Sequence, residues 1–222
     1  MIKALINTYF ANYYGQGRVV EIDESHTTDS RFDLKEDGGV TTIVEAGSGF
    51  ASFDNKAQCD IAVLDYEGYI DKYAGTKFHE KRLKCDCILE SENSSTVILD
   101  ELTSSRKGME NLTKPITRKR QYPGGKFEKV EQQLLVSLQT LNDVPEIAAY
   151  FASQAKRVCL CSYKLYTFDE LEMIGNPVNV FSRGQIEAER QTGENGVIIY
   201  SPHIEALGFE YRRISHTYSY AI

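Results

Sequence analysis

The sequence predicts an α/β (α+β) protein with a mixed central sheet, an antiparallel hairpin within that sheet, and helices that flank it. Strand-like runs recur between residues 40 and 105 and again at 157–164, and a helix of about four turns lies between them. Strands interleaved with helices that bury one apolar side are typical of a sheet covered by helices. At 222 residues the chain can bury a sizeable core, and we expect a single domain over residues 1–222.

The first part of the chain is expected to contain one helix and several strands. Residues 2–14 carry apolar side chains at helical spacing, and the glycines within 15–17 would end that helix. The predicted strands, which are rich in β-branched residues or alternate in hydrophobicity, are 19–22, 40–45, 50–53 and 60–64. The polar stretch between the first two strands is predicted to be flexible, and residues 67–82 to form a short helix or an irregular loop.

The second part of the chain contains the most regular helical pattern. Apolar residues recur every three or four positions from Phe127 to Leu141, which predicts an amphipathic helix. Further expected elements are a helix at 145–155, a buried strand at 157–164, helical pieces at 168–174 and 185–190, and strands at 197–200 and 211–220. The last of these strands interleaves tyrosines with arginines, a pattern typical either of base stacking or of a polar edge strand.

The central segment, residues 79–105, reads as two strands, 84–90 and 96–103, joined by a polar turn. If these strands pair, Asp86 on the first and Glu101 on the second can meet near one end of the hairpin. Two converging carboxylates on rigid strands are suitable ligands for a hard divalent cation.

Other acidic residues of the same segment are alternative ligands. Asp100 and Glu90 lie on the same two strands, and the sequence does not decide the register of the pairing. Glu80, which precedes the first strand, could complete the site. In an ordinary hairpin the same carboxylates would instead be solvent-facing charges, paired with a neighbouring basic residue.

A basic connection follows the hairpin. From Arg106 to Lys129 there are eight basic residues and two glutamates. The net charge of −7 argues against a protein that coats nucleic acid non-specifically, but this stretch could contact phosphate locally or form a solvated loop. The residues expected to contact DNA are Arg106, Lys107, Arg118, Lys119 and Arg120.

The five cysteines favour a reducing, cytoplasmic setting. Four of them form two C-x-C pairs, Cys85 with Cys87 and Cys159 with Cys161. Alternate strand positions project in parallel and do not wrap a metal ion, so core packing is predicted in place of a zinc site. Residues 1–14 are too polar for a signal peptide, and no run approaches the roughly 20 apolar residues of a membrane span.

The order of a strand with an aspartate, a strand with a glutamate, a basic loop, an amphipathic helix and a buried strand resembles the PD-(D/E)xK, or restriction endonuclease-like, nuclease superfamily. Asp86 in KCDCILE and Glu101 in VILDELTSS match its two acidic positions. The resemblance covers about residues 60–165, which would form the nuclease-like core. It implies Mg²⁺ or Mn²⁺ bound by the two carboxylates, hydrolysis of DNA, and a role in restriction or phage defence.

Thr103 departs from the pattern of that superfamily, which has a lysine at this position to polarise the phosphate and activate water. A threonine hydroxyl carries no charge and cannot replace it. Lys107 is assigned this catalytic role, with Lys84 and Lys114 as further candidates. Two functions stay open: a Mg²⁺-dependent endonuclease, and a catalytically inactive nuclease-like subunit with a structural or recognition role, which would bind protein partners in a larger defence assembly.

Overall fold

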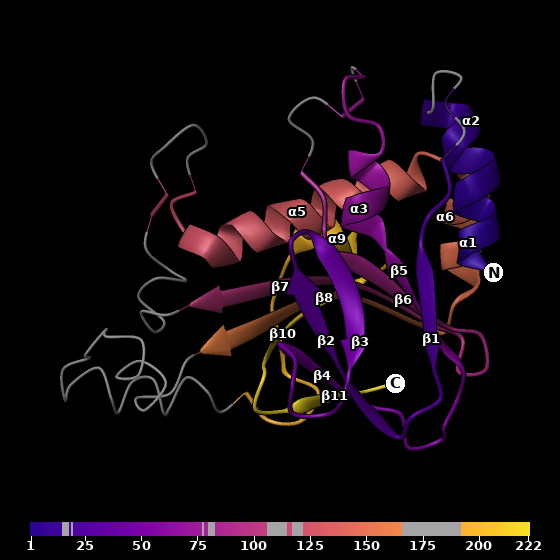
Figure 1. The fold of residues 1–222 in the computed structure, drawn as a ribbon. Coiled ribbons are helices and arrows are strands. Elements are labelled where there is room, and N and C mark those ends of the chain that lie inside the picture. The colour runs from indigo at the N-terminus through magenta and orange to yellow at the C-terminus, as the bar shows by residue number, and fades with distance from the viewer. Residues whose placement is uncertain are drawn as a thin grey trace.

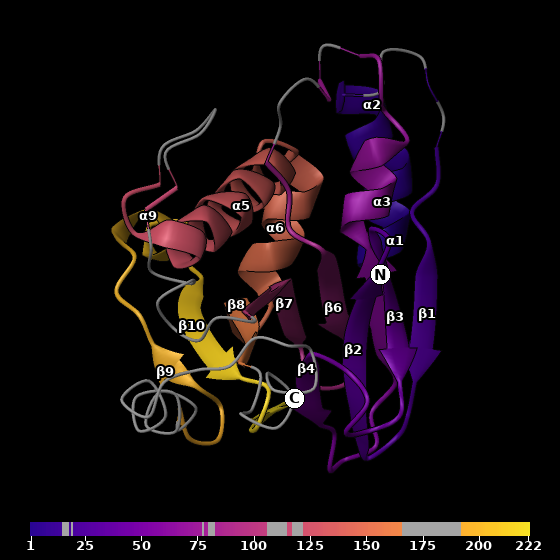
Figure 2. The ribbon, with the colours of Figure 1, turned by 60° about the vertical axis from the view of Figure 1, so that its left-hand side comes forward.

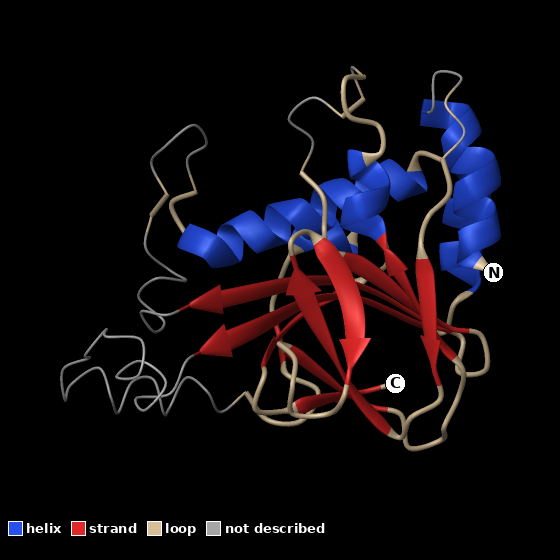
Figure 3. Ribbon diagram, in the orientation of Figure 1, coloured by secondary structure: helices blue, strands red, loops and turns tan. Residues whose placement is uncertain are grey.

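Helices, a seven-stranded sheet and a four-stranded sheet form three layers in the computed structural model of the chain (Figure 1 and Figure 3). The structure describes residues 1–14, 18, 20–76, 78–79, 83–105, 115–116, 122–165 and 192–222. The helices lie on one face of the larger sheet, and the smaller sheet lies against the other face. The predicted mixed α+β architecture is therefore confirmed, but the prediction that helices flank the central sheet is correct for one face only.

The larger sheet has the strand order β1-β5-β6-β7-β8-β10-β9. Neighbouring strands from β1 to β7 are antiparallel, β7, β8 and β10 run parallel, and β9 is antiparallel to β10. The strands are β1 (Glu24–Thr27), β5 (Ile61–Asp65), β6 (Cys87–Ser91), β7 (Thr96–Ser105), β8 (Lys156–Leu165), β9 (Val197–Ile198) and β10 (Glu210–Ser215). The parallel pair β7 and β8 requires a crossover connection, and the long helix α5 lies within it.

The smaller sheet has the order β11-β4-β2-β3, with β11 parallel to β4 and the other pairs antiparallel. Its strands are β2 (Arg31–Asp37), β3 (Val40–Val44), β4 (Ala51–Asp54) and β11 (Ser219–Ala221). The β2–β3 hairpin turns at Gly38 and Gly39, whose φ angles are 64° and 84°. A two-residue hairpin turn with positive φ at both positions favours glycine, which explains this pair in the sequence.

The helices bury one apolar side each against the larger sheet. They are α1 (Ile2–Leu5), the π-helical turn η1 (Ile6–Phe10), α2 (Ala11–Tyr14), α3 (Tyr66–Asp71), α5 (Gly125–Asn142), α6 (Pro145–Ser153) and α9 (Pro202–Glu205). Figure 2 shows α5 and α6 on the side of β7, β8 and β10, and α1 to α3 on the side of β6 and β1. The predicted helices at 2–14, 127–141 and 145–155 are confirmed.

Two apolar cores separate the layers, and β6 and β7 contribute to both. Ile88 of β6 and Leu99 of β7 pack under the helices, whereas Leu89 and Ile98 pack between the two sheets. This alternation follows from the pleat of a strand that is buried on both faces. The hairpin therefore presents one set of side chains to α5 and the other set to the smaller sheet.

Several predictions for the chain outside the hairpin are wrong. Residues 20–23 lie outside any strand, while the polar stretch that follows, predicted to be flexible, contains β1 and β2. The predicted strand at 211–220 is divided into β10 and β11, which belong to different sheets. The helical pieces predicted at 168–174 and 185–190 lie outside the described residues.

Candidate metal centre at the open end of the central hairpin

Asp86 and Glu101 lie near each other where the β6–β7 hairpin opens. The register pairs Cys87 with Asp100, and the Asp86 N–H donates to the carbonyl of Asp100 at 3.2 Å. Asp86 itself precedes β6, and this hydrogen bond places it beside Asp100 at the end of the paired register. Glu101 lies on the face of β7 that α5 covers, and its carboxylate is close enough to Asp86 for the charge of Asp86 to act on it. The two carboxylates are therefore close in space, but Asp86 lies before β6 and not within a strand as predicted.

Both carboxylates are buried, with 6% of each residue exposed, so they are not the solvent-facing charges of an ordinary hairpin. The backbone N–H of Leu102 donates to Oδ2 of Asp86 at 2.7 Å. The side-chain amide of Gln133 on α5 donates to Oε1 of Glu101 at 2.7 Å and to the carbonyl of Lys84 at 2.9 Å. Within the described part of the chain, Oε2 of Glu101 has no hydrogen-bond partner.

The electrostatics of the site disfavour two negative charges. Burial raises the pKa of Asp86 well above its usual range, and the charges of Glu67 and Asp100 raise it further. Burial is also the main cause of the raised pKa of Glu101, to which the charge of Asp86 adds and which the charge of Lys129 opposes. Two buried carboxylates this close favour a shared proton or a bound cation.

Glu67 is a third carboxylate near the pair, and the sequence did not reveal it. It lies in the first turn of α3, where its backbone N–H donates to the carbonyl of Asp86 at 3.0 Å. Its charge acts on both Asp86 and Glu101. Glu80, the residue expected to complete the site, lies outside the described residues. The signal for Glu67 in the sequence was weak, because its approach depends on the turn between β5 and α3.

The basic residues near the site come from α5 and from the segment before β6. The Lys84 ammonium forms an ion pair with Asp71 and lies 3.5 Å from Oε1 of Glu67. Lys126 on α5 donates to the carbonyl of Ser104 at 2.7 Å, and burial lowers its pKa. Lys129, one turn closer to Gln133, acts electrostatically on Glu101.

The other residues assigned to a cation or to DNA are outside the described part of the chain. They are Arg106, Lys107, Lys114, Arg118, Lys119 and Arg120. Thr103, which stands at the position of the family lysine, lies on β7 opposite Tyr163 of β8 and is half-buried.

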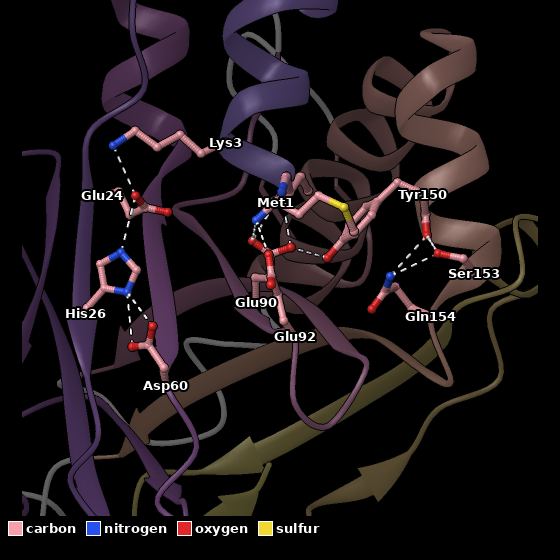
Figure 4. A network of polar contacts seen from close by, with 11 residues as sticks. Met1, Lys3, Glu24, His26, Asp60, Glu90, Glu92, Tyr150, Ser153 and Gln154 are labelled. Atoms are coloured by element: carbon pink, nitrogen blue, oxygen red, sulfur yellow. Dashed lines mark hydrogen bonds and ion pairs between the residues drawn. The ribbon is translucent and has the colours of Figure 1, made fainter.

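The alternative ligands Asp100 and Glu90 lie elsewhere. Asp100 projects to the opposite face of β7, where Oγ of Ser162 donates to its carboxylate at 2.9 Å. Glu90 lies near the closed end of the hairpin and accepts hydrogen bonds from the Met1 ammonium at 2.8 Å, from the Ile2 N–H and from the Tyr150 hydroxyl (Figure 4). Both carboxylates therefore have hydrogen-bond donors of their own.

The other side chains singled out from the sequence are structural. Each member of the two C-x-C pairs is a free, buried cysteine. Tyr211 and Tyr220 are 0% and 1% exposed, which contradicts base stacking by these rings, and β10 lies inside its sheet, whereas β11 is at the edge of the other. Among the described residues, no group of three or more His, Cys, Asp or Glu side chains is arranged to hold a metal ion.

In the part of the chain that the structure describes, no helix is both long and apolar enough to span a membrane. Comparison of the chain with protein-family models, with curated protein sequences and with solved structures found no match.

Proposed function

We propose that this protein is a metal-dependent nuclease-like protein that acts on DNA, with Asp86 and Glu101 as its metal ligands. The observation that carries the proposal is the buried carboxylate pair at the open end of the β6–β7 hairpin, in which Oε2 of Glu101 has no partner among the described residues. A buried carboxylate oxygen without a partner is costly, so a retained one is best explained by a ligand.

The donor set fits Mg²⁺ or Mn²⁺. Mg²⁺ is usually bound by one or two carboxylates and keeps several waters, so a pair of protein ligands is sufficient. Gln133 and the Leu102 N–H hold one oxygen of each carboxylate and leave the other oxygens for a cation. When bound, such an ion polarises phosphate oxygens and lowers the pKa of water.

The order of the elements supports a restriction endonuclease-like core. The antiparallel strands β5, β6 and β7 are followed by α5 and then by β8, which runs parallel to β7. Asp86 stands just before the second of these strands and Glu101 lies within the third, in agreement with the expected positions of the acidic residues.

Lys129 is the described lysine best placed to replace the one absent at Thr103. It lies on the same helix as Gln133, and its charge favours the ionised form of Glu101. In this role it would stabilise the charge that develops on phosphate during attack by water. Lys107 keeps its proposed catalytic role as the alternative source of that charge.

The second candidate is a catalytically inactive nuclease-like subunit of a larger defence assembly. Thr103 favours it, because this residue supplies no charge on the face of β7 that carries Glu101. An inactive subunit of this kind would keep the scaffold and bind a protein partner.

Metal binding and cleavage test the proposal separately. Titration with Mn²⁺ by calorimetry should show one saturable site that is lost in Asp86→Asn and in Glu101→Gln. Asp100→Asn is the matched control, because it changes the next residue of β7 on the opposite face. Unchanged Mn²⁺ binding in both site variants would refute the assignment.

Cleavage of plasmid and single-stranded DNA with Mg²⁺ or Mn²⁺ then distinguishes the two candidates. Cleavage that both site variants abolish, and that Lys129→Ala slows by an order of magnitude or more, supports the nuclease. Mn²⁺ binding without cleavage supports the inactive subunit.

A further inference from the structure

A cavity of about 580 Å³ opens on the side of the molecule where the edges of the two sheets meet. β1 is the outer strand of the larger sheet at this side, and β3 is the outer strand of the smaller sheet. Residues of both strands line the cavity together with Val63 and Asp65 of β5. Its volume lies within the range of about 300–1,000 Å³ that is typical of small-molecule sites.

The register of β1 against β5 shows which side chains face this cavity. Ser25 and Thr27 stand opposite Val63 and Ile61, which pack between the sheets, so they share that face. Glu24 and His26 alternate with them and project to the helix side. There Lys3 binds the Glu24 carboxylate at 3.0 Å, and His26 lies between Glu24 and Asp60, which precedes β5 (Figure 4).

One buried and one exposed carboxylate, Asp65 and Asp23, contribute to the acidic lining of the cavity. The Asp65 N–H donates to the carbonyl of Asp23 at 3.0 Å, which places these residues side by side on β5 and before β1. Asp65 is 7% exposed, and burial together with the nearby charge of Asp23 raises its pKa. Lys72 binds Asp23 from outside at 2.7 Å, and no lysine or arginine is among the described residues that line the cavity.

Thr41 of β3 adds a polar group without a partner. The residue is 6% exposed, and its backbone N–H lies close enough to the Asp65 carboxylate to lower the pKa of that group. Its hydroxyl Oγ1 has no hydrogen-bond partner within the described ranges. A buried hydroxyl beside a buried carboxylate, in a cavity lined by acidic, neutral polar and apolar residues, is an arrangement that a ligand would complete.

We propose that this cavity binds an alkylammonium group, the chemistry that a free polyamine shares with the lysine side chain of a partner protein, through Asp65, Asp23 and Thr41. An ammonium has three N–H donors and no acceptor, which matches two carboxylates and a hydroxyl. Its methylene chain would pack against Val63 and Ile43 on the cavity wall. A metal ion fits less well, because no group of three suitable ligands is present among the described residues.

The proposal is independent of the metal centre. Asp65 pairs with Cys87, whose side chain packs between the sheets, whereas Glu101 lies on the helix side of β7, where Gln133 of α5 donates to it. The site also differs in its ligand, since it is expected to bind an alkylammonium group and not Mg²⁺.

Calorimetric titration of the full chain tests the proposal with two probes, spermidine and a capped tripeptide with a central lysine. We expect saturable binding of at least one probe with a stoichiometry of one. Tighter binding of spermidine would assign the site to a free polyamine, and tighter binding of the tripeptide to a protein partner. The absence of saturable binding for both probes would overturn the proposal.

Three variants locate the binding. Asp65→Asn removes the charge but keeps an acceptor for the Gly68 N–H that caps α3, and we expect at least a tenfold loss of affinity. Thr41→Val removes only a hydroxyl that has no described partner, so it should fold normally and bind about fivefold more weakly. Asp37→Asn, on an exposed residue outside the cavity, controls for a general charge effect.

These variants also give the results that would contradict the proposal. Equal weakening by Asp65→Asn and Asp37→Asn would assign binding to net charge and overturn it. Wild-type affinity in Thr41→Val would do the same, and this readout holds if Asp65→Asn fails to fold. Asp86→Asn should bind both probes as the wild type does, so the result stands apart from that of the metal centre.

Discussion

Replacement of Asp100 by asparagine is expected to flatten the pH dependence of stability. Asp100 is 0% exposed, and its carboxylate accepts a hydrogen bond from Ser162 at 2.9 Å. Burial raises its pKa from 3.8 to about 7. The folded state therefore binds a proton more tightly than the unfolded chain does, and the stability contributed by this group falls as the pH rises from about 4 to about 7.

The magnitude follows from the pKa difference. A rise from 3.8 to about 7 is roughly three pH units, and each unit corresponds to about 1.4 kcal/mol, so ionised Asp100 costs roughly 4 kcal/mol above pH 7. Asparagine is isosteric and neutral and keeps an acceptor for Ser162. Its buried amide gains hydrogens that need partners, which offsets about 1–3 kcal/mol of the gain. The slope of stability against pH is therefore a better readout than its absolute value.

The measurement is urea denaturation of wild type and Asp100→Asn at intervals between pH 4 and 8. We expect the difference in unfolding free energy to grow in favour of the variant by roughly 4 kcal/mol over this range. Asp37→Asn is the control, since its side chain is 82% exposed and should leave the slope unchanged. A pH-independent difference between wild type and Asp100→Asn would refute the reasoning.

Two further predictions concern buried groups away from the candidate site. Glu90 is 2% exposed and binds the Met1 ammonium at 2.8 Å, so Glu90→Gln should lower the free energy of unfolding by about 1.5–3 kcal/mol in urea. Glu92→Gln, at a side chain that is 64% exposed, should change the free energy of unfolding by less than about 1 kcal/mol. Equal effects of Glu90→Gln and Glu92→Gln would contradict this account. Burial raises the pKa of Cys85, Cys87, Cys159 and Cys161, so these thiols should react slowly. In the native protein a thiol reagent should therefore modify only the half-buried Cys59 quickly. Fast modification of a second thiol would contradict this prediction, because it would show that one of the four is accessible.

The sequence was informative where one pattern determines one element. The period of the apolar residues from Phe127 to Leu141 predicted α5 because a helix with a single buried side must repeat in this way. Alternation likewise placed Glu101 on the same face of β7 as Leu99, under the helices. It failed for Cys85, which packs on the helix side although Cys87 faces the smaller sheet. Cys85 and Asp86 precede β6, where the period of two no longer applies.

The elements that the sequence missed depend on partners distant in the chain. β2 reads as a polar loop because Asp33 interrupts its apolar residues, yet this aspartate is buried and accepts hydrogen bonds from the N–H groups of Gly47 and Gly49. The Asp33 carboxylate thus stabilises a turn that follows later in the sequence. The cavity beside Asp65 and Thr41 was also unpredictable, since it is formed by the edges of two sheets whose packing no local pattern encodes.

Asp100 and Glu101 show why a raised pKa alone does not identify a functional site. Both are buried neighbours on β7, and burial raises the pKa of each. Asp100 has a hydroxyl donor from Ser162, so a structural role accounts for it. Glu101 faces a second buried carboxylate, Asp86, and keeps one oxygen without a partner among the described residues. Repulsion between the two carboxylates lowers the stability of the fold, and a bound cation would offset this loss. The missing partner of the Glu101 oxygen and the neighbouring charge of Asp86 therefore favour a metal centre, and Mn²⁺ titration of Glu101→Gln against Asp100→Asn separates these causes from burial.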